Sequence, residues 1–244
     1  MNMKSLNKFL YTLIISLAVV SCTTINEFVQ KHSSAGWYTV KTSDTLYSIA
    51  WRYGLDYQQL ARWNQIGGDF IIHPDQRLRL FAPENDTIAA DDTVQDKTTK
   101  AVRSTAQAKP DDPVKAENGP VSWQWPTSGR IMKTFAARIL DRKGIDIAGK
   151  LGQSIHAVAN GKVVYSGNGL VGYGNLIIIK HNDTYLSAYA YNQQRLVKEG
   201  VTVKAGTVIS KMGRHPDGTT RLHFEIRKNG KPVDPLKYLP RLGA

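Results

Sequence analysis

The sequence predicts a mainly β protein, in which a small β-α-α-β domain and a C-terminal antiparallel β-sandwich are joined by a flexible linker. Three observations lead to this prediction. The 20 glycines and 10 prolines among 244 residues indicate many turns. From Trp125 onward, β-branched or aromatic runs bounded by Gly, Asn and Asp dominate the sequence. Residues 82–121 lack aromatic residues and hold few large apolar ones, so they cannot bury enough surface to fold.

The N-terminus has the features of a secretory signal peptide. Lys4 and Lys8 precede the apolar run Phe9–Val20, which is shorter than the ~20 residues of a membrane-spanning helix. Cys22 is the only cysteine in the chain, and it follows a small residue just after that run. This arrangement resembles a bacterial lipobox, which implies that Cys22 is lipidated and becomes the mature N-terminus. The alternative is an ordinary signal peptide cut near Ser21 that leaves the cysteine unmodified.

A lipidated cysteine would attach the protein stably to a membrane, because each buried methylene contributes ~0.8 kcal/mol. Thr23 follows Cys22, instead of the Asp that favours inner-membrane retention in enterobacterial lipoproteins. The resemblance therefore implies the periplasmic face of the outer membrane. The predicted organisation is a signal peptide, a lipidated tether, a first module, a disordered linker and a second module, over residues 1–21, 22–36, 37–81, 82–121 and 122–244. A random coil of the linker's length reaches roughly 35 Å.

The positive charge of the chain is concentrated in the second module. Lys and Arg outnumber Asp and Glu by 32 to 20 overall and by 19 to 7 in residues 122–244, so that segment holds the whole excess of +12. Such a surface attracts polyanions or an acidic protein partner. Export argues against nucleic acid. The alternative to a specific partner is a solvated surface drawn to anionic cell-wall polymer or lipid head groups.

In the first module, a short alternation at Tyr38–Val40 predicts a strand, and residues 42–45 form a turn with candidate helix N-caps. Apolar residues then recur at helical spacing up to Gly54, a second helical stretch ends at Asn64, and Leu78 and Leu80 alternate as a closing strand. The order resembles the LysM domain, on the matching residues Tyr38-x-Val40, Ser43-Asp44-Thr45-Leu46-x-x-Ile49-Ala50, Leu60-x-x-x-Asn64 and Ile72-x-Pro74-x-Gln76-x-Leu78-x-Leu80.

LysM domains bind glycans that contain N-acetylglucosamine, including peptidoglycan, in a shallow groove. The resemblance implies that peptidoglycan is a partner and that the groove is formed by Ser43, Asp44, Thr45, Leu46, Ile71, Ile72 and Pro74. A structural interpretation stands beside it, in which Leu46 and Ile72 belong to the core and Asp44 and Thr45 cap the helix. Both interpretations can hold for the same residues.

The second module resembles the lysostaphin/LytM-type zinc metallopeptidases over about residues 125–240. The matching motifs are Lys143-Gly144-Ile145-Asp146-Ile147, Gly172-Tyr173-Gly174-Asn175-Leu176-Ile177-Ile178, Tyr189-Ala190 and Leu222-His223-Phe224-Glu225. Active members cut peptide crosslinks in peptidoglycan. Their zinc is held by a His four residues before an Asp, by that Asp, and by the second His of a His-x-His strand. Alternate residues of a strand share one face, so the first His of His-x-His can act on the zinc-bound water.

Only two of these five positions match the active pattern. Asp146 and His223 correspond to zinc ligands, whereas Arg142, Arg221 and Tyr191 stand where the first ligand and the two catalytic histidines are expected. Arg has no lone pair to donate and stays protonated. Two guanidinium groups would also repel a dication. We therefore predict a non-catalytic domain with no metal and no cofactor.

The other histidines are poor candidates to replace the missing zinc ligand. His32 and His73 lie outside the module, His156 and His181 fall in or beside predicted strands where a structural role is expected, and His215 sits in a loop near the site. Asp146 is instead expected to pair with an arginine, Arg142 or Arg221, which would keep the shape of the groove without metal.

Lipobox, LysM-like module, linker and degenerate peptidase-like domain together resemble the NlpD-type family of murein hydrolase activators. That resemblance implies a protein that activates a periplasmic N-acetylmuramoyl-L-alanine amidase for septal peptidoglycan splitting during daughter-cell separation. The implied partner-binding groove is formed by Arg142, Asp146, Tyr191, Arg221 and His223. Two alternatives stay open, an active zinc DD-endopeptidase with an unusual site and a purely structural peptidoglycan-binding lipoprotein.

Overall fold

The structure is a computed structural model that describes residues 36–83, 119–139 and 142–241. The predicted signal peptide, Cys22, nearly all of the tether and most of the linker lie outside these residues. In the part of the chain that is described, no helix has the length and apolar character needed to cross a membrane.

The first module has the predicted β-α-α-β order. Its elements are β1 (Trp37–Thr39), α3 (Leu46–Tyr53), α4 (Tyr57–Trp63) and β2 (Arg77–Arg79), and the two strands pair antiparallel. The side chain of Thr45 accepts a hydrogen bond from Ser48 N, while the side chain of Ser48 accepts one from Thr45 N, so both orphan donors at the start of α3 are satisfied. Gly54 ends the helix with φ +66°, a left-handed conformation that glycine adopts without strain.

The second module is a sandwich of two antiparallel sheets, as predicted. Its strands are β3 (Ile131–Lys133), β4 (Ile145–Ala148), β5 (Ser154–His156), β6 (Gly161–Gly167), β7 (Leu176–Lys180), β8 (Tyr185–Ala190), β9 (Asn192–Arg195), β10 (Thr202–Val203), β11 (Val208–Met212), β12 (Arg221–Lys228) and β13 (Lys231–Val233). The larger sheet has the order β10-β6-β7-β8-β12-β4-β3, with β13 beside β12, and the smaller has the order β5-β11-β9. A short 3-10 helix, η1 (Pro235–Lys237), follows β13.

The inner core lies between the two sheets. Ile177 and Ile179 of β7 and Phe224 of β12 point into it and are fully buried, as are Ile155 and Ile209 of the smaller sheet. Alternate residues of a strand point to opposite faces. The remaining side chains of β7 and β12 must therefore lie on the outer face of the larger sheet.

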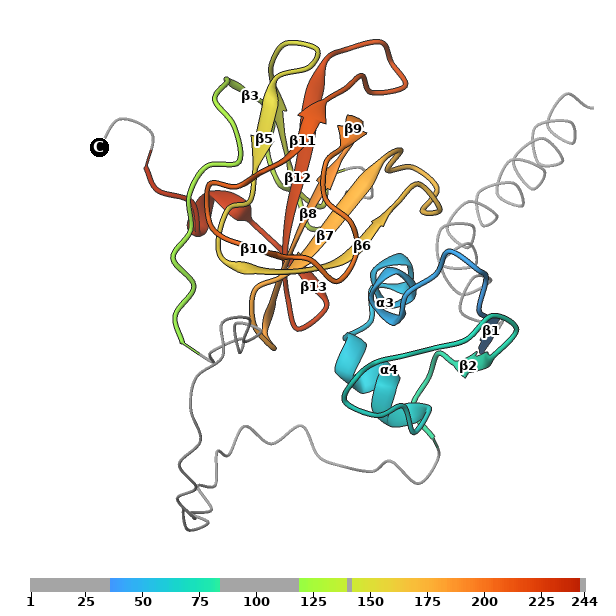
Figure 1. The fold of residues 1–244 in the computed structure, drawn as a ribbon. Helices are drawn as coiled ribbons and strands as arrows, with labels where there is room; N and C mark the ends of the chain where they lie inside the picture. The colour runs from blue at the N-terminus through green and yellow to red at the C-terminus, as the bar shows by residue number, and fades with distance from the viewer. Residues whose placement is uncertain (1–35, 84–118, 140–141, 242–244) are drawn as a thin grey trace, which may run out of the picture.

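The outer face of the larger sheet is covered by the first module. Leu176 and Ile178 of β7 and Ala188 of β8 belong to one buried cluster with Leu46 and Trp51 of α3. Figure 1 shows α3 beside the sheet that contains β6 and β7. The sequence was interpreted as two modules separated by a flexible linker, and this packing was not predicted. The apolar run Leu176–Ile179, buried on both faces, is the sequence signal for it, since a sheet exposed on one side alternates with polar residues.

Candidate functional site

The two remnant zinc-ligand positions face each other across neighbouring strands. Asp146 on β4 and His223 on β12 are directly opposite in register. Gly144, just before β4, permits this close approach, because a Cβ at that position would collide with the carbonyl oxygen of Phe224. His223 Nδ1 lies 2.7 Å from Asp146 Oδ1, so the two side chains contact each other directly.

Arg221 fills the rest of the site. Its Nε lies 2.9 Å from Asp146 Oδ2, and its Nη1 donates a 2.7 Å hydrogen bond to Asp217 Oδ2 and a further one to Thr219 Oγ1. The arginine is only 2% exposed. The expected pairing of Asp146 with an arginine is therefore present, and the partner is Arg221.

The buried polar groups continue along the outer face of β12. Glu225 Oε1 lies 3.1 Å from His223 Nε2 and accepts a 2.8 Å hydrogen bond from Tyr173 Oη, while Glu225 Oε2 accepts one of 3.2 Å from Arg227 Nε. Charges of opposite sign thus alternate over about one strand length. We call this set the β12 charge chain: Asp217, Arg221, Asp146, His223, Glu225 and Arg227.

The charge chain ends on the first module. Arg227 Nη1 donates a 2.8 Å hydrogen bond to the carbonyl oxygen of Trp51, and its guanidinium lies 3.6 Å from the centroid of the Trp51 ring. Arg227 is 1% exposed and Trp51 is 3% exposed. A guanidinium stacked on an aromatic face is stabilising, and more so when water is excluded. The LysM-like module is therefore in direct contact with one end of the charge chain.

Protonation of His223 is favoured by its neighbours. Burial opposes the charged imidazolium, but hydrogen bonds to Asp146 and Glu225, together with the negative charges of both carboxylates, raise the pKa of His223 to about 9. Burial likewise opposes ionisation of Glu225, yet the charge of Arg227 and the contact with His223 lower the pKa of that carboxyl. Near neutral pH both ring nitrogens of His223 carry protons and donate to carboxylates.

This arrangement does not fit a zinc ion. Two ligands of a tetrahedral zinc, each ~2.0 Å from the metal, lie roughly 3.3 Å apart, whereas Asp146 and His223 are in direct hydrogen-bond contact. The guanidinium of Arg221 also lies against Asp146. Among the described residues, no group of three His, Cys, Asp or Glu side chains is arranged to hold a metal ion.

The other two residues of the predicted groove, Tyr191 and Arg142, are half-buried and do not belong to the charge chain. Tyr191 follows β8 with φ +60°, an uncommon conformation for a bulky residue, and its hydroxyl donates a 2.7 Å hydrogen bond to Gly172 O. Its ring centroid is 6.1 Å from that of His223 and 4.5 Å from that of His215. Arg142 is turned towards the preceding loop, where its Nε and Nη2 donate 2.8 Å hydrogen bonds to Thr134 O and Thr134 Oγ1.

His181 and His156 have the structural environments expected of them. His181 is 6% exposed, and its two ring nitrogens lie 2.8 Å from Asn160 O and from Ser187 Oγ. Burial lowers its pKa to about 4, although the contact with Asn160 O opposes this shift. His156 Nδ1 lies 3.2 Å from Pro126 O. Neither side chain forms part of the remnant zinc site.

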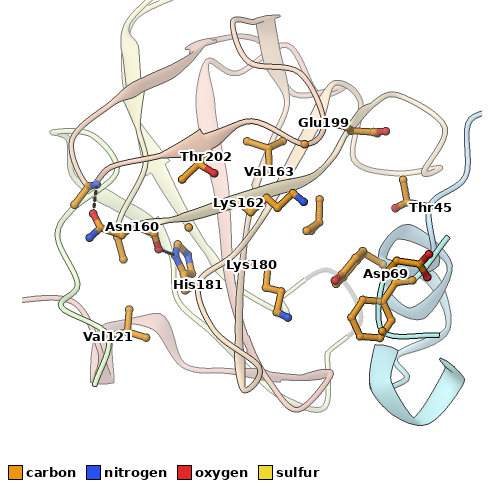
Figure 2. Close-up of a pocket in the computed structure, with 18 of the residues that line it drawn as sticks. Thr45, Asp69, Val121, Asn160, Lys162, Val163, Lys180, His181, Glu199 and Thr202 are labelled. Carbon is orange, nitrogen blue, oxygen red and sulfur yellow. Dashed lines mark hydrogen bonds between the residues drawn. The ribbon is translucent and has the colours of Figure 1, made fainter. Parts of the chain in front are cut away.

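The predicted glycan residues take different positions. Asp44, Thr45, Ile71 and Ile72 line a cleft of about 1180 Å³ between the two modules, whose opposite wall includes Lys162 and Lys180. Figure 2 shows Thr45 and Asp69 on one side of this cleft and Asn160 and His181 on the other. The remaining three predicted residues are placed as follows: Leu46 is fully buried in the core, Ser43 lies near Gly169, and Pro74 is exposed outside the cleft lining.

Sequence reasoning missed the continuation of the site beyond His223. Glu225, Arg227, Tyr173 and Trp51 were not predicted to take part. The sequence does hold a signal for two of them, because Arg221, His223, Glu225 and Arg227 alternate with Leu222, Phe224 and Ile226 on one strand. The contact with Trp51 depends on packing between modules that lie far apart in sequence.

The shifted pKa values of His181 and His223 predict that the free energy of unfolding is greatest near pH 6.5. Above that pH, unfolded His223 is neutral while the folded residue keeps its proton until about pH 9, so stability is lost as the pH rises through this window. Below it, the unfolded chain protonates His181 before the folded chain does, so stability is lost towards about pH 4. A single group changes the free energy of unfolding by up to ~1.4 kcal/mol per pH unit. Urea denaturation at a series of pH values measures both limbs.

Two variants show which histidine causes the loss of stability on each side of the maximum. His223→Gln is expected to flatten the decrease on the alkaline side, and His181→Gln the decrease on the acid side. An alkaline limb that is unchanged in His223→Gln would contradict the raised pKa of His223 in the folded protein.

Comparison with known proteins identifies both modules. The LysM domain family matches residues 38–81, and peptidase family M23 matches residues 141–235. The first match agrees with the β-α-α-β module and the second with the sandwich that carries the charge chain. The predicted resemblance of each module is therefore confirmed, while the predicted ends of the tether, linker and domains stay predictions.

Three named relatives align with most of the chain. A lipoprotein NlpD/LppB homologue of Pseudomonas aeruginosa PAO1 is 42% identical over 239 residues, covering 85% of this chain and 78% of that protein. The murein hydrolase activator NlpD of Escherichia coli K12 is 40% identical over 260 residues, covering 85% of this chain and 69% of that protein. Lipoprotein YgeR of the same strain is 38% identical over 248 residues, covering 100% of this chain and 96% of that protein.

Proposed function

Because the chain belongs to the NlpD/LppB family of lipoproteins, we propose that it is a non-catalytic activator of a periplasmic N-acetylmuramoyl-L-alanine amidase. In this proposal the M23 domain binds the amidase and the LysM domain binds peptidoglycan. Lipidated Cys22 holds both at the periplasmic face of the outer membrane. Splitting of septal peptidoglycan during daughter-cell separation is then carried out by the amidase.

The observation that carries this proposal is the guanidinium of Arg221 inside the remnant zinc site. It lies 2.9 Å from Asp146, where a peptidase of this family would need a metal ligand free to bind. The charge chain satisfies each remnant ligand with an oppositely charged neighbour. A domain that keeps the peptidase framework while neutralising its metal ligands internally is suited to binding a partner, not to hydrolysis.

In this proposal, the partner contacts the residues at the edge of the groove and not the buried residues of the charge chain. Three residues of the proposed binding groove are at most 8% exposed: Asp146, Arg221 and His223. They hold the surface in place and make little direct contact with a partner. Tyr191 and Arg142 are more accessible. Two apolar side chains flank these residues. Val171 is 98% exposed in the loop whose Gly172 O accepts the Tyr191 hydroxyl, and Ile139 is 45% exposed in the loop that leads to Arg142.

The proposal is tested by mixing the chain from Thr23 to Ala244 with a cognate amidase and dye-labelled sacculi. We expect dye release by the amidase to rise sharply and the chain alone to release none. An unchanged amidase rate would favour a purely structural peptidoglycan-binding lipoprotein. Release by the chain alone would favour an active endopeptidase.

A rim variant tests where the amidase binds. Val171→Asp is expected to lower the stimulation of dye release roughly tenfold, because it places a charge on an apolar side chain that the bound amidase would cover. The same change at Leu236, which is 40% exposed on η1, provides the matched control and is expected to leave stimulation intact. Sacculus binding should be the same for both variants. Equal stimulation by Val171→Asp and the unmodified chain would remove this loop from the binding surface.

A further inference from the structure

The cleft between the two modules has walls of different chemical character. On the LysM side it is lined by Thr45, Ile71 and Ile72 and by the carboxylates of Asp44 and Asp69. Asp44 is engaged within its own module, since Tyr38 Oη donates a 2.5 Å hydrogen bond to it and Arg52 pairs with it at 3.4 Å. The opposite wall is formed by the M23 domain and carries Lys162, Lys180 and Glu199, whose carboxylate accepts a hydrogen bond from Ser166 N (Figure 2).

The two lysines form an unfavourable pair in the absence of an anion. Lys162 on β6 and Lys180 on β7 are direct cross-strand partners. Like charges in this position destabilise a sheet. Lys180 is compensated, because its Nζ lies 2.7 Å from Asp183 Oδ1 and above the rings of Tyr57 and Phe70. Lys162 is exposed and, within the described residues, makes no ion pair.

The cleft is also larger than one sugar needs. Its volume of about 1180 Å³ exceeds the roughly 300–1,000 Å³ of most small-molecule pockets. Such a volume has room for a short oligosaccharide together with a substituent that projects from it. Peptidoglycan has such substituents, since its stem peptides leave the glycan strand and carry free carboxylates.

We propose that this cleft is a composite site for peptide-bearing glycan, in which the LysM wall holds the sugar and Lys162 pairs with a carboxylate of the stem peptide. This inference rests on the proposed peptidoglycan binding by the LysM domain and adds a contribution from the M23 domain. The chain would then bind peptidoglycan that carries stem peptides more tightly than an uncharged N-acetylglucosamine oligosaccharide.

The test compares two soluble ligands, peptidoglycan oligosaccharides with their stem peptides and N-acetylglucosamine oligosaccharides of similar length, which carry neither a peptide nor a carboxylate. Titration calorimetry with the chain from Thr23 to Ala244 is expected to show roughly tenfold tighter binding of the peptide-bearing ligand, the size of one charge-assisted hydrogen bond. Lys162→Glu is expected to bind the peptide-bearing ligand no more tightly than the peptide-free one, because the reversed charge repels the carboxylate. Lys150→Glu, an exposed lysine of the β4–β5 turn, is the matched control and should behave as the unmodified chain.

The outcomes separate this inference from the function on which it rests. Equal affinity of the unmodified chain for both ligands would overturn the composite site but leave glycan binding by the LysM domain in place. Binding of neither ligand would instead overturn the proposed peptidoglycan binding. A Lys162→Glu variant that loses affinity for both ligands equally would show that the lysine does not act on the carboxylate, and would overturn its role towards the peptide.

Discussion

Arg227→Met is expected to lower the free energy of unfolding by about 3–5 kcal/mol, the cost of removing one partner from a buried ion pair. Glu225 is fully buried, and Arg227 Nε is the donor to its Oε2. Methionine keeps much of the length of the side chain but leaves the carboxylate without that partner. The substitution also removes the hydrogen bond to Trp51 O and the stacking on the Trp51 ring, which stabilise the contact between the modules.

Equilibrium urea denaturation measures this effect, and two further variants interpret it. Lys228→Met changes the next residue of the same strand, which is exposed, and should cost less than about 0.5 kcal/mol. Glu225→Gln combined with Arg227→Met should cost less than the sum of the two single changes, because the double variant has no uncompensated charge. A loss below about 1 kcal/mol for Arg227→Met would contradict the account of the charge chain.

The triple variant Arg142→His, Tyr191→His and Arg221→His is expected to bind zinc more tightly than the unmodified chain. It would supply three protein ligands, His at position 142 with Asp146 and His223, which is the number that a catalytic zinc requires. The removal of Arg221 takes a positive charge away from Asp146, which it contacts at 2.9 Å. Within the described residues, the removal of Arg142 gives up the hydrogen bonds of its side chain to Thr134. We expect the affinity for zinc to rise by about 100-fold or more.

Competition with a chromophoric chelator measures this affinity. Adding Asp146→Ala to the triple variant provides the control, since it removes one of the three ligands and should abolish the gain. A triple variant that binds zinc no better than the unmodified chain would show that the three substituted side chains are not what keeps the metal out.

The identity of each module could be predicted from the sequence, because its signals are local. Thr45 and Gly54 delimit α3 by their own backbone and side-chain preferences. The substitution of three zinc-site positions could be read directly from the sequence, since it depends only on residue types, such as arginine at 142 and 221. The pairing of Asp146 with Arg221, and not with Arg142, depended on side-chain direction, which only the structure gives.

The relation between the modules could not be predicted because it depends on contacts between distant parts of the sequence. Trp51 and Arg227 are separated by 176 positions and meet over the outer face of the sheet. The composition of residues 82–121 gave no information on where the modules meet. The contact also makes the LysM domain one wall of the cleft that we propose for peptidoglycan.

The central claim is that this M23 domain activates an amidase and does not itself cut peptidoglycan. The most direct measurement is a chromatographic and mass-spectrometric analysis of the products released from crosslinked sacculi in the presence of zinc, with the chain alone, with the amidase alone and with both. The account predicts no products from the chain alone, and from the mixture an increased yield of free stem peptides and peptide-free glycan. Conversion of crosslinked into uncrosslinked muropeptides by the chain alone would contradict it.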